Sequence, residues 1–107
     1  MDKKKFVLIY EGGSMGDTPE VVKKTNEDWD KWFGMCWSDL VDGGAPFMDK
    51  AMMTNGKESM SSDMRASGYS IITAADYDSA MKAAMMNPVV TSGGKVHVFE
   101  VMIMTQM

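Results

Sequence analysis

The sequence predicts an α+β fold built from two strand–helix–strand halves. In the second half, a β-prone run at 66–73 leads into an alanine- and methionine-rich helix, and Gly93-Gly94 then opens a final strand at 95–105. The first half begins in the same order, with a strand at 5–11 followed by a long amphipathic segment. Two such halves form a split βαβ arrangement, in which the helices connect strands of one sheet.

The strand at 5–11 has the clearest signal in the first half. Its run Phe6-Val7-Leu8-Ile9-Tyr10 combines aromatic and β-branched residues and is apolar on both faces. Such a pattern is typical of a central strand that is covered on both sides. The loop that follows, as far as Asp17, is rich in glycine, so its backbone can approach a ligand closely.

A long helix is predicted to start at Thr18 and Pro19. Threonine can cap a helix N-terminus, and proline fits the first helical position. Apolar residues then recur at helical spacing as far as Leu40. We expect Gly43-Gly44 to end this helix through a left-handed cap.

The middle of the chain is weakly patterned and holds one strong turn signal, Asn55-Gly56. This dipeptide favours a two-residue hairpin turn. We therefore expect a short, partly exposed hairpin from residues 49–54 and 57–60.

The second half is predicted in more detail. Alternation in the 66–73 strand separates Tyr69 and Ile71 from Ser70 and Ile72. Asp76 is a suitable cap for a helix at 77–86, whose small alanines allow close packing on a sheet. Asn87-Pro88 is expected to close that helix, because the residue before a proline avoids helical geometry.

Composition limits the class of protein. A chain of 107 residues is the size of one domain, which we place at 1–107. Its net charge of −4 argues against a nucleic-acid partner, because phosphate binding needs a basic surface. A single cysteine, Cys36, excludes an internal disulfide and fits a reducing compartment, and no apolar run is long enough to span a membrane. We therefore expect a cytoplasmic protein with no membrane partner.

Methionine is unusually abundant, with 14 residues. Thioether ligands suit soft metals such as Cu(I), but these methionines are spread over the whole chain without a cluster of Cys or His. Flexible packing explains them more simply, since methionine fills irregular gaps. We predict no metal site and no cofactor.

Several motifs together resemble a known family. They are Phe6-Val7-Leu8-Ile9-Tyr10, Trp29 and Trp32, Gly43-Gly44-Ala45-Pro46-Phe47, Gly68-Tyr69-Ser70-Ile71-Ile72, Ala75-Asp76, Asn87-Pro88, and Gly94 with Val98-Phe99-Glu100-Val101-Met102. Over nearly its whole length the chain resembles the YCII-related (YciI-like) family. The resemblance implies a ferredoxin-like βαββαβ sandwich that pairs as a dimeric α/β barrel. Some members are small-molecule enzymes, including one that eliminates chloride from a chlorinated aromatic.

The family's proposed site is a histidine on the first helix with an aspartate just before the proline after the second. The matching positions here are Trp29 and Asn87. Neither side chain can exchange a proton in the way that imidazole or a carboxylate can. The family's His/Asp chemistry is therefore not expected in this chain, whereas a pocket in the same place is.

Candidate pocket residues come from the helix and the strands. Trp29 and Trp32 could line a pocket for a flat apolar ligand, or could be core residues packed on the sheet. Tyr10, Tyr69, Ser70 and Asn87 could supply hydrogen bonds to such a ligand.

The candidate acid or base is Glu100 in the last strand. A carboxylate among apolar neighbours at a sheet centre would have a raised pKa and could act in catalysis; the alternative is an edge position or a salt bridge to a lysine. His97 is expected on the opposite face, solvated or already paired. Cys36 is expected to be a small buried hydrophobe.

Strands that are apolar on both faces leave one face uncovered by only two helices, so we expect a second copy to cover it in a homodimer. Three functions stay open. The chain could be a small-molecule-binding homodimer for an apolar or aromatic ligand. It could be an enzyme on a small aromatic or carbonyl substrate with Glu100 as acid/base. It could also be a protein-interaction module with a methionine-rich surface.

Overall fold

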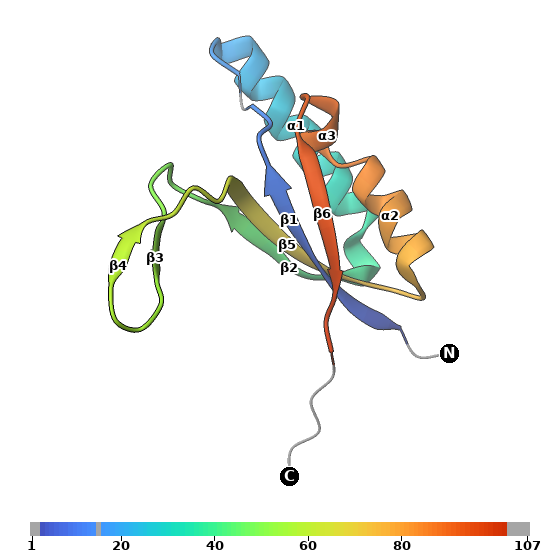
Figure 1. Ribbon diagram of the computed structural model, residues 1–107. Coiled ribbons are helices and arrows are strands. Elements are labelled where there is room, and N and C mark those ends of the chain that lie inside the picture. The colour runs from blue at the N-terminus through green and yellow to red at the C-terminus, as the bar shows by residue number, and fades with distance from the viewer. Residues whose placement is uncertain (1–2, 15, 103–107) are drawn as a thin grey trace.

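A four-stranded antiparallel sheet with helices on one face forms the body of the protein (Figure 1). The computed structural model describes residues 3–14 and 16–102. Its elements are β1 (Lys4–Glu11), α1 (Pro19–Met35), the 3₁₀ turn η1 (Trp37–Asp39), β2 (Leu40–Pro46), β3 (Met52–Thr54), β4 (Ser59–Ser61), β5 (Ala66–Ala74), α2 (Tyr77–Met85), α3 (Pro88–Thr91) and β6 (Lys95–Glu100).

The strand order in the main sheet is β2-β5-β1-β6, and every neighbouring pair is antiparallel. α1 connects β1 to β2 across β5, and the α2–α3 segment connects β5 to β6 across β1. The predicted α+β class and antiparallel sheet are confirmed, and the arrangement is compatible with a ferredoxin-like fold. The dimeric barrel stays a prediction.

The core lies between the sheet and the helices. Phe6, Leu8 and Tyr10 of β1 are buried on the helix side, whereas Val7 and Ile9 are half-buried on the other face. Each large side chain removed from water in this way contributes roughly 1.5–3 kcal/mol. On the helix side the core is completed by Trp32, Cys36, Ile72, Ala74, Ala80, Ala84 and Val89.

The predicted helix starts are confirmed by their caps. Thr18 Oγ1 accepts a hydrogen bond from Val21 N at 3.3 Å, and Asp76 Oδ1 accepts one from Ser79 N at 2.8 Å. Each bond satisfies a backbone donor that the first helical turn leaves free.

The predicted end of the first helix is wrong. α1 ends at Met35 rather than continuing past Leu40, and Gly43-Gly44 lies inside β2 instead of capping a helix. Trp37, which fitted the helical spacing, is 74% exposed. Gly44 has a φ of +79° where the register between β2 and β5 shifts, so its left-handed geometry makes a bulge in the strand rather than a helix cap.

Asn87 also does more than close a helix. α2 ends at Met85, and Asn87 begins the short helix α3, with its Oδ1 accepting from Val89 N at 2.8 Å. The last strand, predicted for 95–105, ends at Glu100, and residues 103–105 of that prediction lie outside the described residues.

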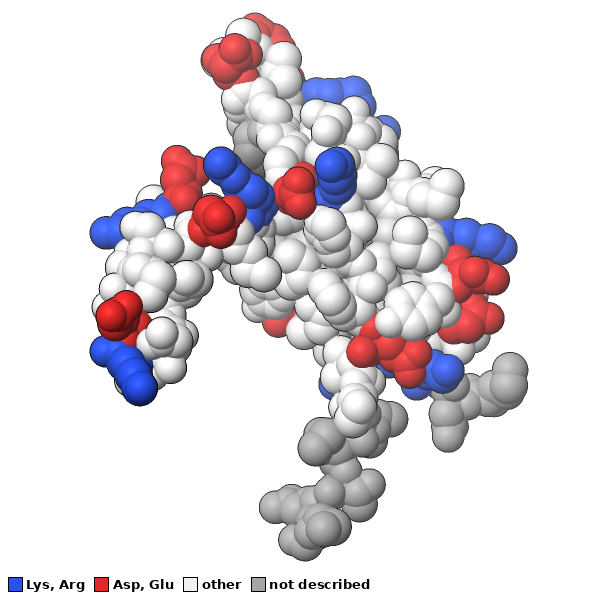
Figure 2. Space-filling model, in the orientation of Figure 1, with Lys and Arg blue, Asp and Glu red and all other residues white. Residues whose placement is uncertain are grey.

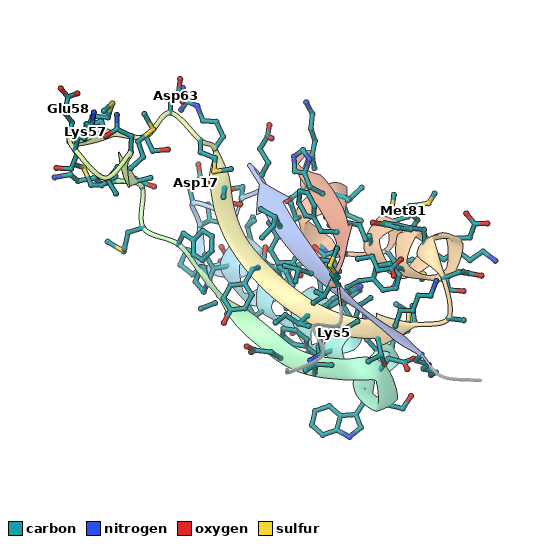
Figure 3. The ribbon with its side chains drawn as sticks, turned by 60° about the horizontal axis from the view of Figure 1, so that its bottom comes forward. Lys5, Asp17, Lys57, Glu58, Asp63 and Met81 are labelled. Carbon is teal, nitrogen blue, oxygen red and sulfur yellow. The ribbon has the colours of Figure 1, made fainter. Side chains whose placement is uncertain are left out.

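The predicted hairpin is confirmed, but its strands are shorter and the predicted two-residue turn is wrong, because Thr54 pairs with Ser59 and the loop spans residues 55–58. β3 and β4 pair in a two-stranded sheet of their own, and Asn55 Oδ1 accepts from the amides of Lys57 and Glu58 in the turn. The hairpin projects from the body on the side away from the helices (Figure 1), and Lys57 and Glu58 lie at its far end (Figure 3).

Among the described residues, no helix is both long enough and apolar enough to cross a bilayer. In the same part of the chain, no three His, Cys, Asp or Glu side chains gather closely enough to hold a metal ion.

Candidate functional site

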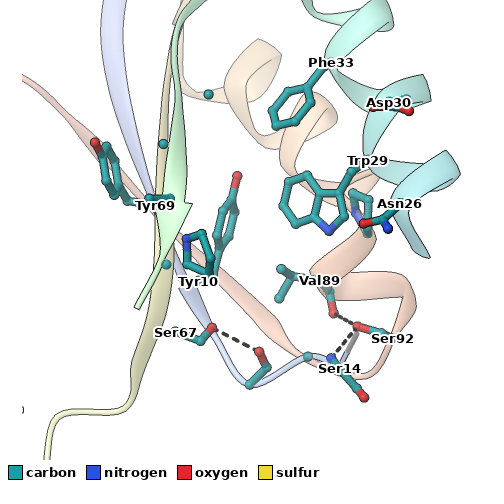
Figure 4. Close-up of a pocket in the computed structure, with 18 residues that line it drawn as sticks. Tyr10, Ser14, Asn26, Trp29, Asp30, Phe33, Ser67, Tyr69, Val89 and Ser92 are labelled. Atoms are coloured by element: carbon teal, nitrogen blue, oxygen red, sulfur yellow. Dashed lines mark hydrogen bonds between the residues drawn. The ribbon is translucent and has the colours of Figure 1, made fainter. Parts of the chain in front are cut away.

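A pocket of about 590 Å³ lies between α1 and one end of the main sheet (Figure 4). It opens where β1 and β2 end and β5 begins, and α3 closes one side. Its volume falls inside the range of roughly 300–1,000 Å³ that is usual for small-molecule sites.

Aromatic rings form the inner wall of the pocket. Trp29 and Phe33 extend from α1 towards Tyr10 of β1 (Figure 4). The ring centres of Tyr10 and Trp29 are 5.5 Å apart at an edge-to-face angle of 65°, and those of Trp29 and Phe33 are also 5.5 Å apart. Ring pairs at these separations stabilise one another, so the wall holds its shape without a ligand.

The floor of the pocket is the loop after β1, with Gly12, Gly13 and Ser14. Ser67 Oγ of β5 donates to Gly12 O at 3.0 Å, and Ser14 N donates to Ser92 Oγ beyond α3 at 3.2 Å (Figure 4). These two bonds tie the loop to β5 on one side and to the end of α3 on the other.

A buried hydrogen-bond chain holds Tyr10 from behind. Asn87 Nδ2 donates to Tyr10 Oη at 3.2 Å, Tyr10 Oη donates to Ser70 Oγ at 2.6 Å, and Ser70 Oγ donates to Gly43 O at 2.7 Å. Ser70 and Asn87 are fully buried. Burial raises the pKa of Tyr10, and the hydroxyl directs its proton to Ser70.

The predicted pocket residues therefore take different positions. Tyr10 and Trp29 line the pocket, whereas Ser70 and Asn87 lie behind Tyr10 and position it. Trp32 is not a lining residue. It is a core residue, 2% exposed, whose Nε1 donates to Ala83 O at 2.9 Å.

Tyr69 contributes to the pocket's rim, but its ring points away from the aromatic wall, on the other side of the strand (Figure 4). There it stacks on Phe47, with ring centres 5.9 Å apart, and donates to Asp42 Oδ2 at 3.1 Å. That hydrogen bond raises the pKa of Tyr69. The Tyr69 side chain thus packs on the helix-free face of the sheet.

Glu100 is not among the lining residues, and of the two placements considered for it the structure has the edge position beside a lysine, not the sheet centre. β6 is an edge strand, and the Glu100 carboxylate is about one-third exposed, 4.0 Å from Lys4 Nζ. His97 lies on the opposite face of β6, where its Nε2 is 2.9 Å from Glu11 Oε1 and lowers the pKa of Glu11. Cys36 is buried as expected, and burial raises the pKa of its thiol.

Two polar lining residues were missed at the level of sequence. Asn26 and Asp30 share one stripe of α1 with Trp29 and Phe33, because residues three, four and seven apart lie on the same helix face. That spacing was the available signal. That signal is weak, because a carboxylate beside an indole on a helix is more often part of a solvated face.

No protein-family model matches the chain, and a search of curated proteins finds no significant match. The YCII-like resemblance therefore stays a prediction.

Proposed function

We propose that this chain is a YCII-like small-molecule-binding protein that holds a flat, largely apolar ligand in the pocket between α1 and the sheet. The observation that carries this proposal is the aromatic wall of Tyr10, Trp29 and Phe33 around a pocket of about 590 Å³. Mostly apolar walls with a few well-placed polar groups are the usual make-up of a ligand site.

Binding is better supported than catalysis. The Tyr10 proton is committed to Ser70, and Glu100 and His97 are not lining residues. Among the described residues, no acid–base pair therefore converges in the pocket, as general acid–base catalysis would need. The proposed function therefore gives Glu100 no catalytic role.

The homodimer belongs to the same proposal. A second copy would cover the helix-free face of the sheet, where Val7, Ile9, Tyr69 and Ile71 are only half-buried and Phe99 is 57% exposed. Apolar surface of this kind favours association.

Titration with 3-methylindole, a neutral flat aromatic, tests the pocket. We expect saturable binding by calorimetry and amide shift changes in NMR spectra at Gly13, Ala45 and Trp29. Trp29→Ala should weaken binding about fivefold, as the loss of a good aromatic contact implies.

Trp37→Ala is the matched control, because Trp37 is 74% exposed and is not a lining residue. It should bind with the affinity of the unchanged chain. Absence of saturable binding, or shift changes confined to another surface, would overturn the proposal.

A further inference from the structure

We propose that the pocket selects ligands in which the flat aromatic body carries a cationic amino group, held at Asp30 and Asn26. This inference rests on the proposed function and goes beyond it by naming the charge and the orientation of the ligand. It draws on the charges at the pocket, on the direction of the hydrogen bonds around it, and on the position of the aromatic wall.

The charges at the pocket have one sign. Asp30 is the only charged side chain among the described residues that line it, and no described lysine or arginine forms an ion pair with Asp30. A second hollow, lined by the start of α1 and the residues before it, shares Asn26 and Asp30 and adds Asp17, Glu27 and Lys23. Acidic groups therefore outnumber basic ones around the mouth, so a cation is attracted and an anion repelled.

Three hydroxyl groups around the pocket already use their protons within the protein. The hydroxyl groups of Tyr10, Ser67 and Ser92 already donate to groups of the protein, at 2.6, 3.0 and 3.1 Å. These side chains have no proton left to offer a ligand. In contrast, the Asp30 carboxylate and the Asn26 amide oxygen are acceptors at the exposed rim. A ligand that donates hydrogen bonds is matched by these acceptors, and the charge of Asp30 repels a carboxylate or phosphate.

The aromatic wall favours the same ligand. Asn26 and Asp30 lie on the same stretch of α1 as Trp29, one turn before it and one residue after it (Figure 4). Asp30 also lies one turn before Phe33 and is a lining residue, so an ammonium group that extends from a ring against Trp29 and Phe33 towards the rim meets its carboxylate. The indole and phenyl faces attract a cation as well, through their quadrupoles.

Three probes with one ring system test this inference: tryptamine, 3-methylindole and indole-3-propionate, which are cationic, neutral and anionic at pH 7. We expect the unchanged protein to bind tryptamine about fivefold more tightly than indole-3-propionate, which is the order of effect that one partly solvated charge gives. Asp30→Asn keeps the shape of the side chain and should reduce this preference to less than about twofold, with 3-methylindole binding unchanged.

Asp28→Asn is the matched control. It makes the same change of net charge on the same helix, but Asp28 pairs with Lys24 at 2.6 Å and is not a lining residue. The preference for tryptamine should survive in this variant and should shrink in high salt.

The outcomes separate the two proposals. Equal affinity for all three probes, a preference for indole-3-propionate, or a preference that survives Asp30→Asn overturns the cation inference and leaves the aromatic pocket standing. Failure of every probe to bind overturns the proposed function itself, and the cation inference with it.

Discussion

Tyr10 shows how one residue can belong to both the core and the pocket. Its ring forms part of the aromatic wall, while its hydroxyl accepts from Asn87 and donates to Ser70 in a buried chain. A buried hydroxyl with both kinds of partner has one favoured orientation. The pocket wall is therefore held by the same contacts that join β1, β5 and the start of α3.

Tyr10→Phe removes the hydroxyl and leaves Asn87 Nδ2 without its partner. We expect the free energy of unfolding to fall by about 1–2 kcal/mol, the usual result when a buried donor is left unsatisfied. Urea denaturation followed by circular dichroism measures it. Tyr69→Phe is the control, since its hydroxyl bonds Asp42 at the exposed surface, and should cost less than about 0.5 kcal/mol. Equal effects of the two variants would contradict the role given to the chain.

The individual residues were predictable only where their chemistry is unambiguous. Tyr10 and Trp29 stood out as large aromatics in amphipathic elements, and both line the pocket. Asp30 did not stand out, because the direction of a charged side chain depends on how α1 is rotated against the sheet. For Glu100 the sequence left two placements open, the sheet centre and the edge. Its face of the strand follows from alternation, but whether β6 is central or at the edge depends on strand order, which local sequence does not encode.

At the scale of elements, the boundary between α1 and β2 is where local pattern and tertiary structure disagree. Trp37 and Leu40 continue the helical spacing of α1, yet the chain leaves the helix at Met35 so that Leu40–Pro46 can pair with β5. Pairing with a neighbouring strand outweighs a weak local preference. The starts of α1 and α2 and the strands β1 and β5, whose signals are local, were predicted to within a few residues, whereas α3 was not predicted.

Gly44 makes this pairing possible, so its substitution tests the β2–β5 bulge. Its φ of +79° disfavours any other residue, and a Cβ there would lie 1.6 Å from Tyr69 O. Gly44→Ala should reduce the free energy of unfolding by about 3 kcal/mol through strain and overpacking. Gly34→Ala is the contrasting variant, because Gly34 lies within α1 and a Cβ there meets nothing within 4 Å.

Gly34→Ala should stabilise the protein by about 0.5–1 kcal/mol, because alanine loses less backbone freedom in a helix. Chemical denaturation of both variants gives the comparison. A Gly44→Ala protein as stable as the unchanged chain would show that the backbone at the bulge rearranges freely.

At the scale of the whole molecule, the sheet has helices on one side only. The molecule measures 50 × 44 × 18 Å, so it is thin in one direction. On the helix-free side, Val7, Ile9 and Ile71 are half-buried and Phe99 is 57% exposed. Figure 2, which looks at the β6 edge of the sheet, shows a largely uncharged middle with acidic and basic side chains mostly around it. A two-fold interface would place this apolar face against the same face of a second copy.

If a second copy covers this face, one charge placed on it should separate the pair. We expect the unchanged protein at micromolar concentration to give, by size-exclusion chromatography with light scattering, twice the 11.8 kDa mass of one chain. Phe99→Glu should give the single-chain mass, because burying a carboxylate in an apolar interface is costly. Its circular dichroism should be unchanged, because the side chain at this position is already exposed in the single chain.

Met81→Glu, an exposed position on α2 (Figure 3), is the matched control and should remain a dimer. A single-chain mass for the unchanged protein would contradict the homodimer while leaving the pocket, which this chain builds from its own residues, open to the tests above.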